Sequence, residues 1–208
     1  MLGLVSRIRG TLGSGLVRGI GTISLRSARN LHQMSLEEHK AGPKRSIAFA
    51  VLTISDTRTG VPGAPPDLGG DLLVGSIEGA GHRVVLREWS LDEAASIEAA
   101  VRRAALDPTV ELVLTTGGTG IAPRDVTYTT LVRVLDSEIP GFGELFRWLS
   151  FREIGSATIL SRAIGGLLAG KVVLALPGSP KALRLAMDEI VLPEAVHLVT
   201  QARGPRRT

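Results

Sequence analysis

Three short segments of the chain combine glycines with hydroxyl or carboxylate side chains, and each directly follows an apolar run. They span residues 55–70, 115–125 and 177–181. Glycine lets the backbone approach a ligand closely, and free N–H groups ahead of a helix favour an anion. A carboxylate beside such a loop is suited to placing Mg²⁺. These residue types therefore predict a site for a phosphorylated ligand and a divalent cation.

The second segment is the strongest candidate. Its core is the run Thr116, Gly117, Gly118, Thr119 and Gly120, followed by Arg124 and Asp125. The run matches neither the P-loop nor the dinucleotide-binding glycine pattern. A tight strand-to-helix turn would also explain the glycines. Asp125 has two interpretations, as a cap on the following helix or as a Mg²⁺ ligand.

Other candidates also have a structural and a functional interpretation. Ser55 and Asp56 fit an ordinary turn, or a site at the edge of the sheet. Asp92 fits the acidic first turn of a helix that a capping box of Ser90 and Glu93 begins, or a catalytic role. Gly178 and Ser179 fit an ordinary loop that ends a strand, or the wall of a pocket. Arg162 and Lys181 could contact a phosphate.

The elements around these segments alternate between strands and helices. Apolar, β-branched runs predict strands over 47–55, 83–89, 111–116 and 172–176. Helical spacing predicts helices over 71–80, 94–104, 125–135, 181–191 and part of 140–153, with a short helix over 161–168. This order predicts an α/β fold, in which helices cover both faces of a mostly parallel sheet. In such sheets ligands bind beyond the carboxyl ends of the strands, where all three segments lie.

The composition narrows the function classes. The chain has 208 residues, 44% of them hydrophobic, and no cysteine, which excludes disulfides and thiolate metal sites. Its net charge is +4, but residues 1–33 contain five arginines and no acid; the other residues comprise 19 basic and 20 acidic ones. The domain therefore lacks the single-signed field that nucleic acid requires. No apolar run approaches the length of a membrane span, and we expect a cytoplasmic protein.

Three parts are expected along the chain. Residues 1–45 form a basic tail, 46–200 a single α/β domain and 201–208 a second tail. The first tail is compatible with a transit peptide, because it is rich in arginine and serine and poor in acids. We favour a start codon assigned too early, with Met34 as the true first residue. A disordered or surface-associating arm is the third interpretation.

Six motifs together resemble one known family. They are LTISD at 52–56, TTGGTG at 115–120, RDVT at 124–127, IPGFGE at 139–144, ILSR at 159–162 and LPGSPK at 176–181. In this order they resemble the molybdopterin-binding family, which includes molybdenum cofactor biosynthesis protein B and molybdopterin adenylyltransferase. The resemblance covers about residues 46–200.

The resemblance implies a three-layer α/β/α sandwich, a homotrimer or hexamer, and transfer of AMP from Mg-ATP to the terminal phosphate of molybdopterin. The residues 116–120 would hold that phosphate, while Ser161, Gly178 and Ser179 would line the pterin side of the pocket. Asp92 and Asp125 match the family's functional acids and would hold Mg²⁺. Ser55 and Asp56 would join the substrate site.

Two other functions remain open. The segment LSFREIG at 149–155 looks like the protein B branch, in which catalytic competence is not uniform. A non-catalytic molybdopterin-binding or scaffold protein of the same pathway is therefore the first alternative. The second is a nucleotide hydrolase of the related competence-damage type, which would hydrolyse free nucleotides without pterin.

Overall fold

A computed structural model describes residues 45–57 and 63–204, and its centre is a six-stranded sheet. The strand order is β2-β1-β3-β6-β5-β4, with β2, β1, β3 and β6 parallel and β5 and β4 antiparallel. In chain order the strands are β1 (Ala48–Ile54), β2 (Arg83–Ser90), β3 (Leu112–Thr116), β4 (Ser137–Glu138), β5 (Ile164–Leu168) and β6 (Lys171–Leu176).

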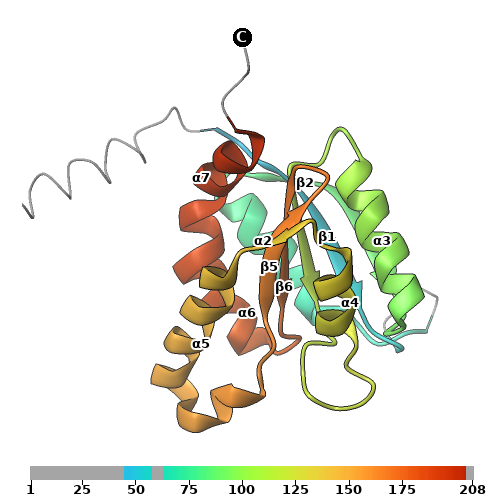
Figure 1. The fold of residues 1–208 in the computed structure, drawn as a ribbon, viewed down its shortest axis with the longest axis vertical. Coiled ribbons are helices and arrows are strands. Elements are labelled where there is room, and N and C mark those ends of the chain that lie inside the picture. The colour runs from blue at the N-terminus through green and yellow to red at the C-terminus, as the bar shows by residue number, and fades with distance from the viewer. Residues whose placement is uncertain (1–44, 58–62, 205–208) are drawn as a thin grey trace, which may run out of the picture. The chain divides into compact units, whose positions relative to one another are not determined.

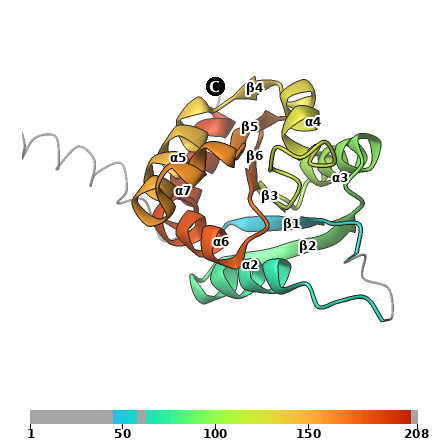
Figure 2. The ribbon, with the colours of Figure 1, turned by 90° about the horizontal axis from the view of Figure 1, so that it is seen from below.

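Helices cover both faces of this sheet, which confirms the predicted α/β sandwich. One face carries α2 (Leu68–Gly79), α5 (Pro140–Ile154), α6 (Pro180–Ala186) and α7 (Leu192–Arg203). The other carries α3 (Ala94–Leu106) and α4 (Thr127–Val134). In Figure 1, α5, α6 and α7 lie to the left of the strands and α3 and α4 to their right; Figure 2 shows the same elements from below.

The central strand β1 shows how the sequence builds these layers. All seven of its residues are buried. Successive side chains of a strand point to opposite faces, so Phe49 and Val51 join the core under α2 and α7, whereas Ala50 and Leu52 join the core under α3. A strand that is buried on both faces has a continuous apolar run, and that run made it predictable.

The prediction of a short helix over 161–168 is wrong. Residues Ile164–Leu168 form β5, which pairs with β6 in an antiparallel hairpin. The two turn residues, Ala169 and Gly170, both have positive φ, of 50° and 71°. This is the requirement of the two-residue turn whose twist matches a hairpin. Ala169 gives no hint of it, because non-glycine residues rarely adopt that conformation.

The capping box predicted at Ser90 and Glu93 is also wrong. Ser90 is the last residue of β2, and its hydroxyl donates to the carbonyl of Leu91. The helix α3 starts only at Ala94, and the side chain of Glu93 makes no capping hydrogen bond. Asp92 therefore lies in a loop before the helix and not in its first turn.

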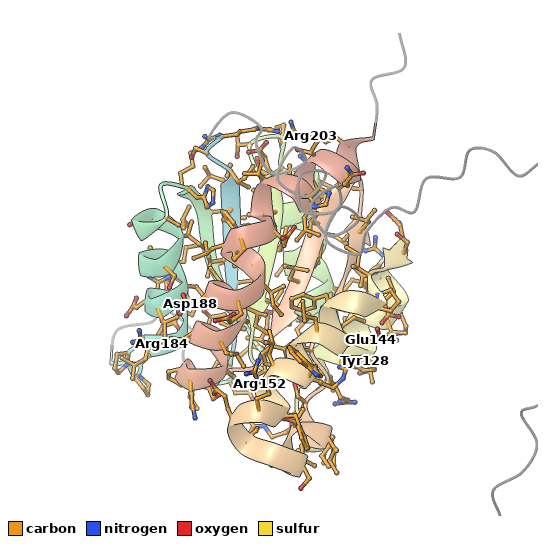
Figure 3. The ribbon with its side chains drawn as sticks, turned by 90° about the vertical axis from the view of Figure 1, so that its left-hand side faces the viewer. Tyr128, Glu144, Arg152, Arg184, Asp188 and Arg203 are labelled. Carbon is orange, nitrogen blue, oxygen red and sulfur yellow. The ribbon has the colours of Figure 1, made fainter. Side chains whose placement is uncertain are left out.

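The last helical segment extends beyond its predicted end at Val191. A π-helical turn, η2 (Met187–Val191), follows α6 and leads into α7, which has a proline in its first turn. Proline removes one backbone donor, and a wide turn just before it lets the chain stay helical. The helix reaches Arg203, past the expected domain limit at residue 200. Arg203 and Arg45 both pair with the buried carboxylate of Glu111; Arg203 is labelled at the end of α7 in Figure 3.

The predicted basic tail, apart from Arg45, lies outside the described residues, as do residues 205–208. The hypotheses of a transit peptide and of a start at Met34 concern that segment and stay predictions. Within the part of the chain that the structure describes, no helix is both long and apolar enough to span a bilayer.

Candidate functional site

A pocket of about 460 Å³ opens where β3 and β6 end. Three segments line it: the glycine-rich loop after β3, the loop after β6, and the second half of α5 with the 3₁₀ helix η1 (Gly155–Leu160). Eight of the predicted site residues lie in its wall, namely Gly117, Gly118, Thr119, Gly120, Asp125, Ser161, Gly178 and Ser179.

The glycine-rich loop has an ordered pattern of carbonyl hydrogen bonds. The carbonyls of Gly117 and Gly118 accept from the hydroxyl and the backbone N–H of Thr127, each over 3.0 Å. The carbonyl of Thr119 accepts from the backbone N–H of Arg162 over 3.0 Å, and that of Gly120 accepts from Nε of Arg162 over 2.7 Å. Four consecutive carbonyls are therefore bonded on the side of α4 and Arg162.

The N–H groups of the same four peptides point the other way, because a trans peptide places its C=O and N–H on opposite sides. No cis peptide occurs in the described residues. These N–H groups belong to Gly118, Thr119, Gly120 and Ile121, and no described residue accepts from them. Unbonded N–H groups beside a pocket are suited to binding an anion.

Two carboxylates pack directly against this loop. A methyl group at Gly118 would lie 2.7 Å from Oδ1 of Asp92, and one at Gly120 would lie 2.5 Å from Oδ2 of Asp125. Gly118 also has a φ of +63°. A side chain at Gly118 would add backbone strain and collide with Asp92, whereas one at Gly120 would force the carboxylate of Asp125 to move.

Asp125 does not cap α4, since the helix starts at Thr127 and its N-cap is Val126. Its carboxylate instead accepts from the backbone N–H of Ala122 over 3.0 Å, while its own N–H donates to the carbonyl of Ala122. These two bonds close a small turn at the pocket wall. The structural interpretation of Asp125 as a helix cap is thus wrong.

Asp92 lies behind the loop and does not line the pocket. Its Oδ1 is buried and has no hydrogen-bond partner among the described residues. Burial is the largest influence on its carboxyl and raises the pKa. The charges of Asp125 and Asp56 raise it further, against the lowering effects of the Val126 backbone N–H and of Arg124. Asp92 is therefore a partly buried acid that lies among other carboxylates.

Asp56 organises the neighbourhood of Asp92. One carboxylate oxygen accepts from the backbone N–H of Asp92 over 3.0 Å, and the other pairs with Nη2 of Arg124 over 2.8 Å. Asp56 comes from the end of β1, so it ties together the chain after β2 and the loop after β3. Both Asp56 and Arg124 remain substantially exposed.

Two further predicted residues lie outside the pocket wall. The hydroxyl of Thr116 donates to the carbonyl of Pro177 over 3.2 Å, and the residue is 2% exposed, so its side chain links the two loops. The backbone N–H of Ser55 donates to the carbonyl of Ser90, and its hydroxyl lies 3.3 Å from that of Thr57.

The wall formed by α5 and η1 was missed in the sequence. It supplies the apolar side chains of Phe146, Ile154 and Leu160 and the hydroxyls of Ser150 and Thr158. The hydroxyl oxygens of Thr158 and Ser161 are buried and have no hydrogen-bond partner among the described residues. This wall offers a flat, mostly apolar ligand both contact area and hydrogen bonds. Only the apolar face of the segment 140–153 could have indicated it.

The carboxylates suit a divalent cation that arrives with phosphates. In the described part of the chain, no three His, Cys, Asp or Glu side chains are arranged as a metal cage. Mg²⁺ is usually bound by one or two carboxylates together with water and substrate phosphates, so it needs no such cage. The unbonded Oδ1 of Asp92 and the clustered charges of Asp92, Asp125 and Asp56 fit this requirement.

Comparison with known proteins agrees with this geometry. Residues 50–197 match the family model described as "Probable molybdopterin binding domain", which spans all three loops. The chain belongs to this family. The resemblance found in the six motifs is therefore confirmed.

Several relatives are named molybdenum cofactor biosynthesis protein B. The protein of that name from Bacillus cereus is 46% identical over 166 residues, covering 79% of this chain and 96% of its own. A crystal structure of a molybdenum cofactor biosynthesis protein B has a TM-score of 0.74 at 43% identity, and the match covers 79% of this chain and 100% of that one. The structure of the tungsten cofactor synthesizing protein MoaB from Pyrococcus furiosus has a TM-score of 0.69 at 34% identity, and the match covers 78% of this chain and 99% of that one.

Proposed function

We propose that this protein acts in molybdenum cofactor biosynthesis by binding molybdopterin and transferring AMP from Mg-ATP to its terminal phosphate. The observation that carries the proposal is the row of N–H groups from Gly118 to Ile121, which face away from their bonded carbonyls. This row offers an anion site at one end of a pocket whose α5–η1 wall suits a flat heterocycle. Family membership supports molybdopterin as the ligand that joins these two features.

The reaction needs positioning more than covalent chemistry. An oxygen of the molybdopterin phosphate attacks the α-phosphorus of ATP, a new P–O bond forms, and the bond to the β-phosphate breaks to release pyrophosphate. The attacking phosphate is already ionised, so no general base is required. The loop amides hold and orient it, which converts a bimolecular encounter into a pre-arranged one.

The two aspartates are assigned to the cation. Mg²⁺, when bound, neutralises the phosphates and stabilises the pyrophosphate leaving group. Asp92 offers an unbonded oxygen behind the loop, and Asp125 offers a carboxylate in the pocket wall. Asp56 and Arg124 hold the chain at Asp92 in place and need not contact substrate.

We also propose that the working form is a cytoplasmic homotrimer or hexamer. Support comes from the apolar side chains of Trp148, Phe151 and Ile159 on α5 and η1, which are at least 59% exposed in the single chain. Large apolar side chains that gather on one surface commonly lie in subunit contacts. Size-exclusion chromatography with light scattering measures the state directly; a monomer at micromolar concentration contradicts this proposal.

A single assay tests the activity. Purified protein is incubated with molybdopterin and Mg-ATP, and adenylylated molybdopterin and pyrophosphate are quantified. Product that depends on both substrates and disappears with EDTA is the expected result. Molybdopterin binding without product would instead support the scaffold alternative, and ATP hydrolysis without pterin would support a nucleotide hydrolase.

A further inference from the structure

We propose that Arg162 is a positioning residue that sets the shape of the glycine-rich loop after β3 and the location of Asp125. The inference rests on the proposed function and goes beyond it, because it assigns a role to a side chain that does not line the pocket. Arg162 directly follows Ser161, which does line it. Arg162 therefore connects the wall formed by α5 and η1 with the glycine-rich loop.

Among the described residues, the hydrogen bonds of Arg162 go to this loop. Its backbone N–H donates to the carbonyl of Thr119 over 3.0 Å. Its guanidinium donates to the carbonyl of Gly120 through both Nε and Nη2, and to the carbonyl of Asp125 through Nη2 over 2.6 Å. One residue thus holds the loop at its middle and at its end.

The guanidinium of Arg162 also lies over the ring of Tyr128 in α4. The carbon atom Cζ of Arg162 lies 5.3 Å from the ring centroid, within the range of a cation–π contact. This attraction favours the position of the side chain in which it reaches the carbonyls of Gly120 and Asp125.

These contacts have a direct consequence for the pocket. Because Arg162 draws the carbonyls of Thr119 and Gly120 to its side, the N–H groups of Gly120 and Ile121 face the opposite way. The bond to the carbonyl of Asp125 fixes the backbone from which that carboxylate extends. Nε and Nη2 of Arg162 are thus engaged by backbone carbonyls of the loop.

The test compares Arg162→Ala and Arg162→Lys with a matched control, Arg147→Ala. Arg147 also donates to a backbone carbonyl, that of Ala163 over 3.2 Å, but it does not contact the loop. The measurements are kcat, KM for molybdopterin, and amide hydrogen exchange at Ala122, Asp125 and Thr127, whose N–H groups are hydrogen-bonded in and beside the loop. We expect Arg162→Ala to lower kcat by roughly 10–100-fold, the loss typical of a small misplacement in a reactive site. Exchange in the loop should become faster, and Arg147→Ala should change neither quantity.

The conservative variants separate positioning from simple instability. Arg162→Lys keeps the charge but can bond only as a point donor, so its kcat should lie between those of wild type and Arg162→Ala. Tyr128→Phe keeps the ring and should retain wild-type kcat and exchange, whereas Tyr128→Leu should resemble Arg162→Lys. In an Asp125→Ala background, Arg162→Ala should cost much less than it does alone, because the residue it positions is gone.

Two results would overturn the proposal. One is unchanged loop exchange in Arg162→Ala combined with a raised KM for molybdopterin, which would make Arg162 a direct phosphate ligand. The other is full additivity with Asp125→Ala. If wild-type protein shows no adenylyl transfer, the proposed function fails, and loop exchange together with the Kd for molybdopterin still decides the role of Arg162.

Discussion

The carboxylate of Asp56 accepts a hydrogen bond from the backbone N–H of Asp92 over 3.0 Å, although 36 residues separate them. The parallel pairing of β1 with β2 makes this contact possible, since Ile54 and Ser90 are opposite each other at the ends of the two strands. The loops that follow these residues leave the same edge of the sheet. Asp92 is therefore held against Gly118 by the sheet topology and not by a helix.

Asp125→Ala should lower adenylyl transfer by roughly 10²-fold or more, a loss typical of removing one key electrostatic contact. The row of loop N–H groups is formed by bonds that do not involve this side chain, so molybdopterin should still bind. Steady-state turnover and the Kd for molybdopterin, measured on the same preparation, check both halves. Unchanged turnover would remove Asp125 from the mechanism.

Asp92→Asn should abolish most turnover and yet raise the thermal stability at neutral pH. Burial and the neighbouring carboxylates raise the pKa of Asp92 above its ordinary value of 3.8. The folded state therefore binds this proton more tightly than the unfolded state does. The stability that this group contributes is fully present below pH 3.8 and is lost as pH rises through its folded pKa. Asparagine keeps an acceptor for the backbone and removes the charge.

The check is Tm as a function of pH for Asp92→Asn, with Asp107→Asn as the opposite control. Hydrogen bonds from the side chain and backbone of Thr109 lower the pKa of Asp107. Ionised Asp107 therefore favours the folded state, and its substitution should lower Tm at pH 7. A lower Tm for Asp92→Asn at pH 7 would contradict the raised pKa of this carboxyl.

Much of this site was predictable because its signals are local. The glycine run after β3 and the apolar run of β1 depend on neighbouring residues alone, and both predictions hold in the structure. Eight of the predicted site residues gather in one pocket because parallel strands end at one edge. Asp92 lies in none of the six motifs; it was included as a match to a functional acid of the family, because its local pattern favoured the acidic first turn of a helix.

What the sequence did not reveal depends on tertiary placement. The five residues of β5 are apolar without a clear period, so strand and helix could not be distinguished, and the Ala169–Gly170 turn is not a usual hairpin signal. The pocket wall on α5 depends on where that helix lies against the sheet. The role of Arg162 was not predicted beyond a contact that it could make with phosphate, because its bonds to carbonyls 42 and 37 residues away have no local signature.

His82 makes stability depend on pH near neutrality. Its Nδ1 accepts from the backbone N–H of Ile47 over 3.2 Å, and its ring lies 5.6 Å from that of Phe49. Burial lowers the pKa of His82 below 6.5, so the unfolded state binds this proton more tightly. The stability it contributes is fully present above pH 6.5 and is lost as pH falls toward the folded pKa.

His82→Asn replaces the acceptor by one that does not titrate. We expect the decline of Tm between pH 7 and pH 5 to become shallower than in wild type. Urea denaturation at the same pH values provides a second measurement, since the midpoint should move in parallel. An identical decline in both proteins would show that protonation of His82 does not contribute.

Gly120→Ala isolates the position of the Asp125 carboxylate. The new methyl group would lie 2.5 Å from Oδ2 of Asp125, and Gly120 does not have the positive φ that would add backbone strain. The carboxylate must move, so kcat should fall by roughly 10–100-fold with little loss of stability. Gly75→Ala in α2 is the matched control, because a methyl group there meets nothing within 4 Å. That control should keep full turnover and gain about 0.5–1 kcal/mol of stability from its helical position. Wild-type turnover in Gly120→Ala would mean that the carboxylate has room to move without effect, and its assigned position would then have no role in the reaction.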